Sequence, residues 1–233
     1  MNLLLLSNST NHGAGYLDHA IAAVKTLLGD GRRVAFVPFA LADHQAYTAK
    51  VTARLEQEGI EVDGVTPDAD GRAVIDRCQA MFVGGGNTFR LLDALQRSTL
   101  LHVLRERAVA GMPYLGASAG TNIAAPTIRT TNDMPIVQPA SFEALSLVPF
   151  QINPHYLDPD PASSHMGETR ETRLREYLEE NETPVIGLRE GAWIRVVGDA
   201  RTLGGATGAR VFRRDAEPVE LAPGSDLASL VED

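Results

Sequence analysis

Residues 116–120, with Ser118 at their centre, have the Gly-x-Ser-x-Gly pattern of a nucleophile elbow. They follow a short apolar run, residues 113–115, and precede residues 121–125, which can begin a helix. Glycines two residues before and after the serine remove clashes in the crowded turn from strand to helix. Ser118 is therefore a candidate nucleophile. The alternative is a glycine-alanine turn that only lets a helix pack closely.

A second glycine cluster, residues 84–86, ends another apolar run and is followed by Asn87 and an amphipathic segment, residues 88–95. Bare backbone amides at the start of a helix can hold a phosphate or stabilise an oxyanion. The Lys-Ser or Lys-Thr pair of phosphate loops is missing, and the glycine spacing is not that of dinucleotide-binding proteins. The oxyanion interpretation is therefore favoured. The alternative is a tight turn in which Asn87 caps the helix.

A serine nucleophile needs a base, and His155 is the best placed of the six histidines. It follows an apolar run, residues 147–152, and Asn153-Pro154 places it at the end of a predicted strand. His165 stays open as an alternative base. A metal site built on His155 and Asp158 is also open, but a convincing third ligand is missing.

The third member of a catalytic triad is a carboxylate that orients the histidine and stabilises the imidazolium. Glu190 is the best candidate, because it follows the predicted strand 185–188 and would lie at a strand end, where the active sites of open sheets gather. Asp133 and Asp158 are rivals. From periodicity alone, Glu190 fits an exposed turn residue as well as it fits a catalytic one.

The elements that must position these residues alternate between short apolar strands and amphipathic helices. Strands are predicted near residues 2–7, 33–39, 81–84 and 113–117, and Tyr47, Val51 and Leu55 share one helical face between them. This alternation predicts a parallel sheet covered by helices on both faces. After Pro184, four short strands separated by Gly, Asp and Pro turns predict antiparallel additions to one edge of the same sheet. Residues 1–233 are expected to form one domain.

Composition excludes several classes of function. With 30 acidic and 21 basic residues, the net charge of −9 disfavours nucleic acid and anionic membrane surfaces as partners, and no apolar run is long enough to span a membrane. The lone Cys78 cannot form an internal disulfide, so a cytoplasmic location is expected. An anionic substrate would be repelled at long range, so its site needs a local cation.

Five motifs in this order resemble those of the peptidase E (aspartyl dipeptidase) family, whose relatives include cyanophycinase. The resemblance runs from the first strand to about Gly205, and the motifs lie at residues 84–89, 116–120, 153–156, 167–171 and 187–193. It implies an α/β three-layer sandwich with a mostly parallel sheet, like that of class I glutamine amidotransferases, with antiparallel strands at the C-terminal edge. The serine would stand where those enzymes carry a catalytic cysteine.

The resemblance also implies a triad in which Ser118 is the nucleophile, His155 the general base and acid, and Glu190 the orienting carboxylate. The backbone amides of Gly86 and Ala119 would form the oxyanion hole. The chain order serine, histidine, carboxylate differs from that of ordinary α/β-hydrolases, which argues against a lipase or an esterase.

The substrate implied is a short peptide with an N-terminal aspartate, hydrolysed without metal or cofactor. Arg170 is assigned to the aspartate side chain, since its planar fork suits a carboxylate, and Asn87 is also assigned to substrate binding. Without the motif, the favoured interpretation of Arg170 is a position on the solvated face of a helix rich in ion pairs. Arg189 and the loop at residues 158–161 depart from the family pattern and could shift the substrate range. Monomer and homodimer both stay open.

Two other functions compete. One is a cyanophycinase-like hydrolase of β-aspartyl-arginine from the same family. The other is a binding module in which Ser118 and the glycines hold a small anion without reaction.

Overall fold

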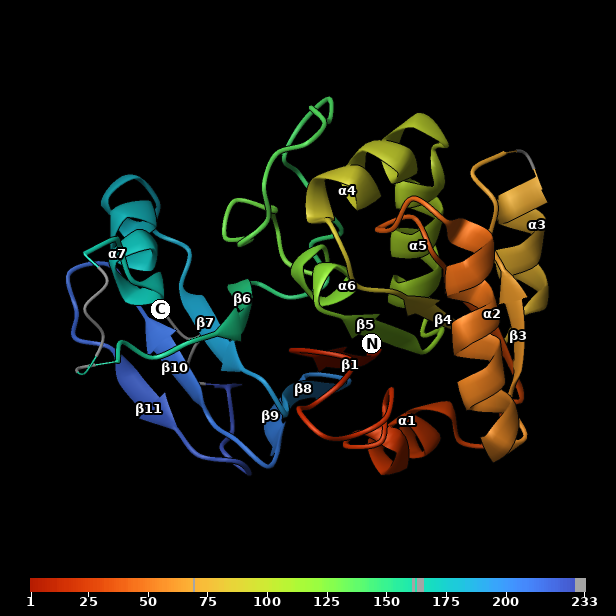
Figure 1. Ribbon diagram of the computed structural model, residues 1–233, viewed down its shortest axis with the longest axis horizontal. Helices are drawn as coiled ribbons and strands as arrows, with labels where there is room; N and C mark the ends of the chain where they lie inside the picture. The colour runs from red at the N-terminus through yellow and green to blue at the C-terminus, as the bar shows by residue number, and fades with distance from the viewer. Residues whose placement is uncertain (69, 161, 163–165, 229–233) are drawn as a thin grey trace.

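The computed structural model describes residues 1–68, 70–160, 162 and 166–228, and its centre is a seven-stranded sheet (Figure 1). The strand order is β3-β2-β4-β5-β1-β8-β9. The first five strands of this order run parallel, β8 pairs with β1 in antiparallel fashion, and β9 pairs with β8 in antiparallel fashion. The bounds are β1 (Asn2–Leu6), β2 (Arg33–Val37), β3 (Glu61–Gly64), β4 (Ala80–Val83), β5 (Tyr114–Ala117), β8 (Ala192–Val197) and β9 (Ala200–Gly205).

Helices cover both faces of the central sheet. In β1 the side chains of Leu4 and Leu6 join the apolar cluster on one face, whereas Leu3 and Leu5 join the cluster on the other. One face is covered by α1 (Ile21–Leu28) and α2 (His44–Leu55). The opposite face is covered by α3 (Asp70–Arg77), α4 (Thr88–Arg97), α5 (Leu100–Val109) and the short α6 (Ala119–Asn122).

Side-chain caps fix where two of these helices begin. Asp43 accepts a hydrogen bond from the Ala46 amide at the start of α2, which continues into a 3₁₀ turn, η1 (Glu56–Glu58). Asn87 accepts one from the Arg90 amide at the start of α4. The buried face of α2 consists of Tyr47, Val51 and Leu55, as the sequence predicts.

A second sheet, called here the small sheet, has four strands in the order β11-β10-β7-β6. In it β6 and β7 are parallel, and β10 and β11 are antiparallel additions. It lies with α7 (Arg170–Glu180) at one end of the molecule, far from α3 (Figure 1). The strands are β6 (Gln151–Tyr156), β7 (Val185–Arg189), β10 (Ala209–Phe212) and β11 (Val219–Leu221).

The small sheet corrects one expectation. Of the strands after Pro184, only β8 and β9 extend the central sheet, and the prediction that all of them do so is wrong. The chain leaves one sheet for the other at Gly191, whose φ of +83° is in the region that favours glycine and whose amide donates to Asn8 Oδ1. β7 then finds its partners in β6 and β10 rather than in β8.

The two sheets share apolar packing. Ile152 of β6 and Ile186 of β7 belong to the same buried cluster as Leu3 and Leu5 of β1. The predicted α/β fold with a mostly parallel, helix-covered sheet and antiparallel strands at its edge is confirmed. Within the part of the chain that the structure describes, no helix combines the length and apolar character needed to cross a bilayer.

Candidate active site

Ser118 occupies a strained turn between β5 and α6. Its φ of 53° and ψ of −109° lie outside the regions that side chains ordinarily adopt, as in a nucleophile elbow. A side chain on Gly116 would come within 2.5 Å of the Gly120 carbonyl oxygen, and one on Gly120 would collide with the Val83 backbone. Both glycines of the motif are therefore required by close backbone approach.

Buried hydrogen bonds hold this turn in place. The Tyr114 hydroxyl donates to the Gly120 carbonyl at 2.6 Å, and burial raises the pKa of Tyr114 well above its usual value, so the donor keeps its proton. The Ser118 amide and the Thr121 hydroxyl both donate to the Leu6 carbonyl, at 3.1 and 2.6 Å. The elbow is thus fastened to the end of β1.

His155 reaches Ser118 from the small sheet. It lies in β6 at an irregularity between Pro154 and Tyr156, with φ of 54°. Its Nε2 is 2.9 Å from Ser118 Oγ, and its Nδ1 is 2.6 Å from Glu190 Oε1. The structure therefore brings together the three residues singled out in the sequence.

Glu190 stands at the turn between β7 and β8, where its carbonyl accepts a hydrogen bond from the Thr207 hydroxyl. The two rival carboxylates are engaged elsewhere. Asp133 accepts from Thr88 and Thr131, and Asp158 pairs with Arg189. The side chains of His155 and Glu190 are 40% and 56% exposed, so solvent can reach this pair.

Two cavities meet at Ser118 and His155, and Asp133 lines both of them. The first, of about 650 Å³, extends toward α7 and contains Arg170 and Arg189. The second, of about 770 Å³, extends toward α2. Its lining includes Tyr16, Tyr47, Lys50, Gly85 and Gly86. A peptide bond lying at the junction would have space on both sides.

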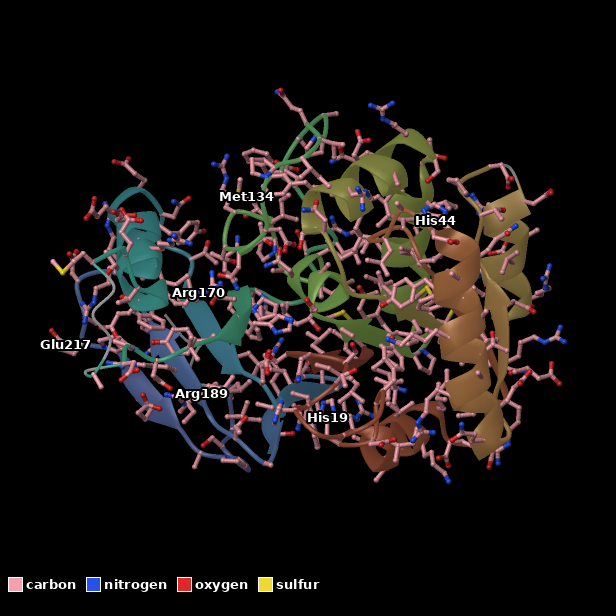
Figure 2. All side chains as sticks on the ribbon, in the orientation of Figure 1. His19, His44, Met134, Arg170, Arg189 and Glu217 are labelled. Carbon is pink, nitrogen blue, oxygen red and sulfur yellow. The ribbon has the colours of Figure 1, made fainter. Side chains whose placement is uncertain are left out.

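The two arginines of the first cavity differ in their partners. Figure 2 labels both, Arg170 at the start of α7 and Arg189 at the end of β7. Arg189 makes two hydrogen bonds of 2.7 Å to Asp158, pairs with Glu220 at 2.9 Å and lies over the ring of Tyr156. Hydrogen bonding to Asp158 raises the pKa of Arg189 and lowers that of the carboxylate. The positive charge of Arg189 is therefore already balanced by these two carboxylates.

The Arg170 side chain has no hydrogen bond or ion pair to any residue that the structure describes. Its pKa is lowered mainly by burial and further by Arg173, whereas the charge of Asp133 acts in the opposite direction. Partly buried cations without a partner are costly, so a ligand carboxylate in this cavity would be strongly attracted to Arg170.

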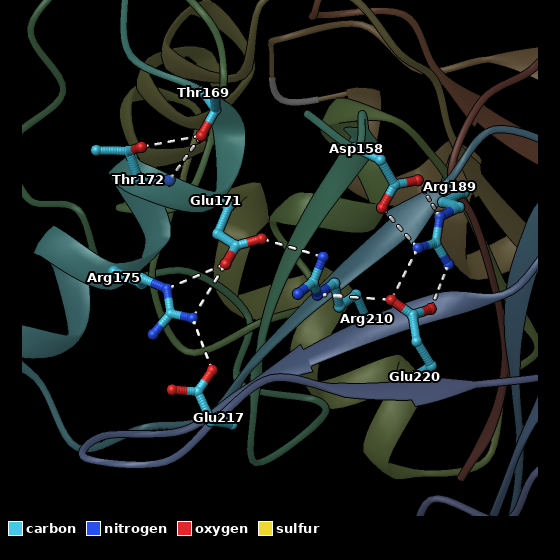
Figure 3. A network of polar contacts seen from close by, with 9 residues as sticks. All are labelled: Asp158, Thr169, Glu171, Thr172, Arg175, Arg189, Arg210, Glu217 and Glu220. Carbon is cyan, nitrogen blue, oxygen red and sulfur yellow. Dashed lines mark hydrogen bonds and ion pairs between the residues drawn. The ribbon is translucent and has the colours of Figure 1, made fainter. Parts of the chain in front are cut away.

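The ion pairs around Arg189 belong to a longer network, shown in Figure 3, that joins α7 to the small sheet. Arg210 of β10 pairs with Glu220 of β11 at 3.5 Å and with Glu171 of α7 at 3.1 Å. Glu171 also pairs with Arg175. The network thus fixes the start of α7 beside the first cavity.

The remaining predicted site residues have the following positions. The Asn87 side chain caps α4 and donates to the Met134 carbonyl, so both of its polar atoms are engaged, and its assignment to substrate binding stays a prediction. Gly86, with φ of +134°, lines the second cavity, and Ala119 lines the first. The neighbouring Gly85 amide donates to the Tyr47 hydroxyl.

No group of three or more His, Cys, Asp or Glu side chains that could hold a metal, around His155 and Asp158 or elsewhere, occurs among the described residues. His165, the alternative base, lies outside the described residues.

Sequence reasoning missed Ser7 and the second cavity. The buried Ser7 hydroxyl, at the end of β1, accepts from the His155 amide at 2.9 Å and donates to the Leu188 carbonyl at 2.7 Å. A serine as the last residue of the predicted strand 2–7 was the available signal. Tyr16, Tyr47 and Lys50 come from separate segments, and no local pattern connects them.

A serine hydroxyl, an imidazole and a carboxylate in hydrogen-bond contact, on an elbow at the carboxyl end of a parallel strand, define the site of a serine hydrolase. The model of peptidase family S51 matches residues 3–204, and the chain belongs to this family of serine-type peptidases. The resemblance found in the sequence is thereby confirmed.

Relatives match over nearly the whole chain. It is 62% identical to "Peptidase E" of Streptomyces coelicolor, over 100% of this chain and 96% of that protein. It is 49% identical to the "Probable alpha-aspartyl dipeptidase" of Drosophila melanogaster, over 99% and 98%. The crystal structure of a peptidase from an acI-B1 Actinobacterium matches with a TM-score of 0.70 over 97% of this chain and 95% of that one, and its 16% identity supports the fold alone.

Proposed function

We propose that this peptidase removes an N-terminal aspartate from dipeptides and that Ser118, His155 and Glu190 carry the reaction. The observation that carries the proposal is the continuous contact from Ser118 Oγ through the His155 ring to Glu190, beside a cavity lined by Arg170, whose side chain has no partner among the described residues. The names of the relatives, peptidase E and alpha-aspartyl dipeptidase, support the same substrate class.

In the proposed mechanism, Ser118 Oγ attacks the carbonyl carbon of the peptide bond while its proton passes to His155 Nε2. The Nδ1–H of the histidine donates to Glu190, which stabilises the imidazolium. The Gly86 and Ala119 amides would receive the developing oxyanion. His155 then gives its proton to the leaving amine, and water hydrolyses the acyl-enzyme with the same histidine as base.

Arg170 would bind the aspartate side chain. Both arginines of the first cavity are cationic, but Arg189 already has two carboxylate partners, Asp158 and Glu220. A neutral side chain in this cavity would leave the Arg170 guanidinium desolvated without a partner. Sites of this kind reject analogues that lack the pairing group by roughly 10⁴-fold.

The test compares kcat/KM for Asp-Leu and Ala-Leu in wild type and in Arg170→Ala. The preference for Asp-Leu should fall by about 100-fold or more, since one partner of a desolvated charge pair is lost. Arg173→Ala is the matched control, because Arg173 is half exposed and contacts Glu168 at 3.5 Å. An unchanged preference in Arg170→Ala would show that another cation reads the substrate.

The cyanophycinase-like alternative is tested by adding β-aspartyl-arginine to the same panel. Faster turnover of this compound than of Asp-Leu would replace the proposed substrate. The non-catalytic alternative is set aside, because the chain belongs to a peptidase family.

A cytoplasmic location is also part of the proposal. Its support is the single cysteine, Cys78, whose thiol has no second cysteine with which to form a disulfide within the chain.

A further inference from the structure

An N-terminal aspartate carries two charges near the bond to be cleaved. The side-chain carboxylate is the charge proposed to meet Arg170. The other is the α-ammonium group, which is only two bonds from the carbonyl carbon and must therefore come close to Ser118 Oγ during attack. An ammonium group removed from water needs oxygen acceptors, and a carboxylate gives the strongest hydrogen bonds.

Asp133 is placed where such an acceptor is needed. It lines both cavities that meet at Ser118 and His155, so it lies at their junction. Its charge also acts on Arg170 across the first cavity. The two side chains thus offer a carboxylate and a guanidinium to one end of the same ligand.

The hydrogen bonds of Asp133 leave one of its oxygens available. Oδ2 accepts from the Thr88 amide at 2.7 Å, from the Thr88 hydroxyl at 2.6 Å and from the Thr131 hydroxyl at 3.1 Å. No residue that the structure describes donates to Oδ1. Three donors on one oxygen fix the carboxylate, and the other oxygen is free for a ligand.

The other carboxylates in the two cavities are less suitable. Glu190 contacts His155 Nδ1, on the opposite side of the imidazole from Ser118. Both oxygens of Asp158 are bound by Arg189. Asp43 caps α2 and lines only the second cavity.

We infer that Asp133 is a specificity-determining residue that binds the α-ammonium group of the substrate through Oδ1. The inference rests on the proposed function, because it takes Ser118 as the nucleophile and Arg170 as the partner of the aspartate side chain. Together Asp133 and Arg170 recognise a residue that carries both a free ammonium group and a carboxylate, so peptides with a blocked N-terminus are refused.

The test uses succinyl-leucine, which is Asp-Leu without its ammonium group. Wild type should have a kcat/KM about 100-fold or more higher for Asp-Leu, and in Asp133→Asn this ratio should approach one, mainly through loss of Asp-Leu turnover. Asp158→Asn removes the same charge from the first cavity and should keep the wild-type ratio. An unchanged ratio in Asp133→Asn would overturn the inference.

Two measurements separate this outcome from misfolding and from failure of the proposed function. A fluorophosphonate reagent should label Ser118 in Asp133→Asn as it does in wild type, which shows an intact site. Calorimetry on the same proteins should find that wild type binds L-aspartate more tightly than succinate and that the variant does not. Equal preference for L-aspartate in both proteins would refute the inference, whereas wild type that fails to cleave Asp-Leu would refute the proposed function itself.

Discussion

The central sheet and the small sheet supply different parts of the active site, and they fix those parts by different means. The central sheet presents Ser118 on a turn whose shape follows from adjacent glycines and from short backbone contacts. The small sheet presents His155 and Glu190, which are 35 positions apart in the sequence and meet only because β6 and β7 pair. The shape of the nucleophile's turn is thus set by neighbouring residues, whereas the base and the carboxylate meet only through long-range packing.

The two sheets also differ in how they are packed. Both faces of the central sheet are covered by large apolar clusters. Behind the small sheet, α7 contributes the buried Leu174 and Leu178 and the partly buried Tyr177 to a small cluster that includes Tyr156 and Phe212. Ion pairs supplement it on the exposed side (Figure 3). The small sheet therefore depends more on specific polar contacts, whose loss can be measured one at a time.

The largest expected effect comes from the contact between the two regions. Ser118→Ala should fold normally and lose on the order of 10⁴-fold or more in turnover, and His155→Ala should lose nearly as much. The double variant should be no worse than either single one, since the two residues act as a unit. Activity of folded Ser118→Ala within tenfold of wild type would exclude the mechanism.

At the end of β7, Glu190→Gln should lower turnover less than Ser118→Ala does. The Glu190 side chain is 56% exposed, so water can take over part of its interaction with His155. Turnover of Asp-Leu by the two variants, under one set of conditions, makes the comparison. Equal losses would mean that the carboxylate is as essential as the nucleophile despite its exposure.

Stability tests whether the two regions unfold separately. Leu178→Ala should lower the free energy of unfolding by about 2–5 kcal/mol, as expected for a buried leucine, and Leu95→Ala in α4 should do the same in the central core. Because Ile152 and Ile186 belong to the central cluster, we expect one transition in both variants. A separate early transition in Leu178→Ala, followed by denaturant titration, would show that the small sheet unfolds alone.

The smallest expected effect concerns the ion pairs. Hydrogen bonding to Arg189 lowers the pKa of Asp158, so its stabilising contribution is present above the usual pKa of an aspartate and is lost as pH falls through the lowered value. Asp158→Asn should cost about 0.2–1 kcal/mol at neutral pH, because the pair is partly exposed. Thermal unfolding at neutral and acid pH should show this difference shrink on acidification. A difference that grows at acid pH would contradict the assignment.

The sequence predicted those features that depend on local pattern. The strands around Ser118 and the buried face of α2 follow from periodicity, and the elbow follows from its glycines. β3 was missed because Glu61–Gly64 contains one apolar residue, Val62, and the small sheet was misplaced because strand partners are not encoded in a strand's own residues. The free oxygen of Asp133 depends on Thr88, 45 positions away, so no spacing rule could find it.

The Ser7 hydroxyl affects how a shift between the two sheets would change the geometry of the active site. It touches the backbone of His155 in β6 and the backbone next to Arg189 in β7, while Ser7 itself continues β1 of the central sheet. His155 lies in β6, and Glu190 directly follows β7, which pairs with β6. A small rotation of one sheet against the other would therefore move both residues together and keep the distance between them. The misalignment would then appear almost entirely between His155 and Ser118. The buried Ser7 hydroxyl, together with the Asn122 side chain that donates to the Ile152 carbonyl of β6, opposes such a rotation and so keeps His155 within reach of Ser118.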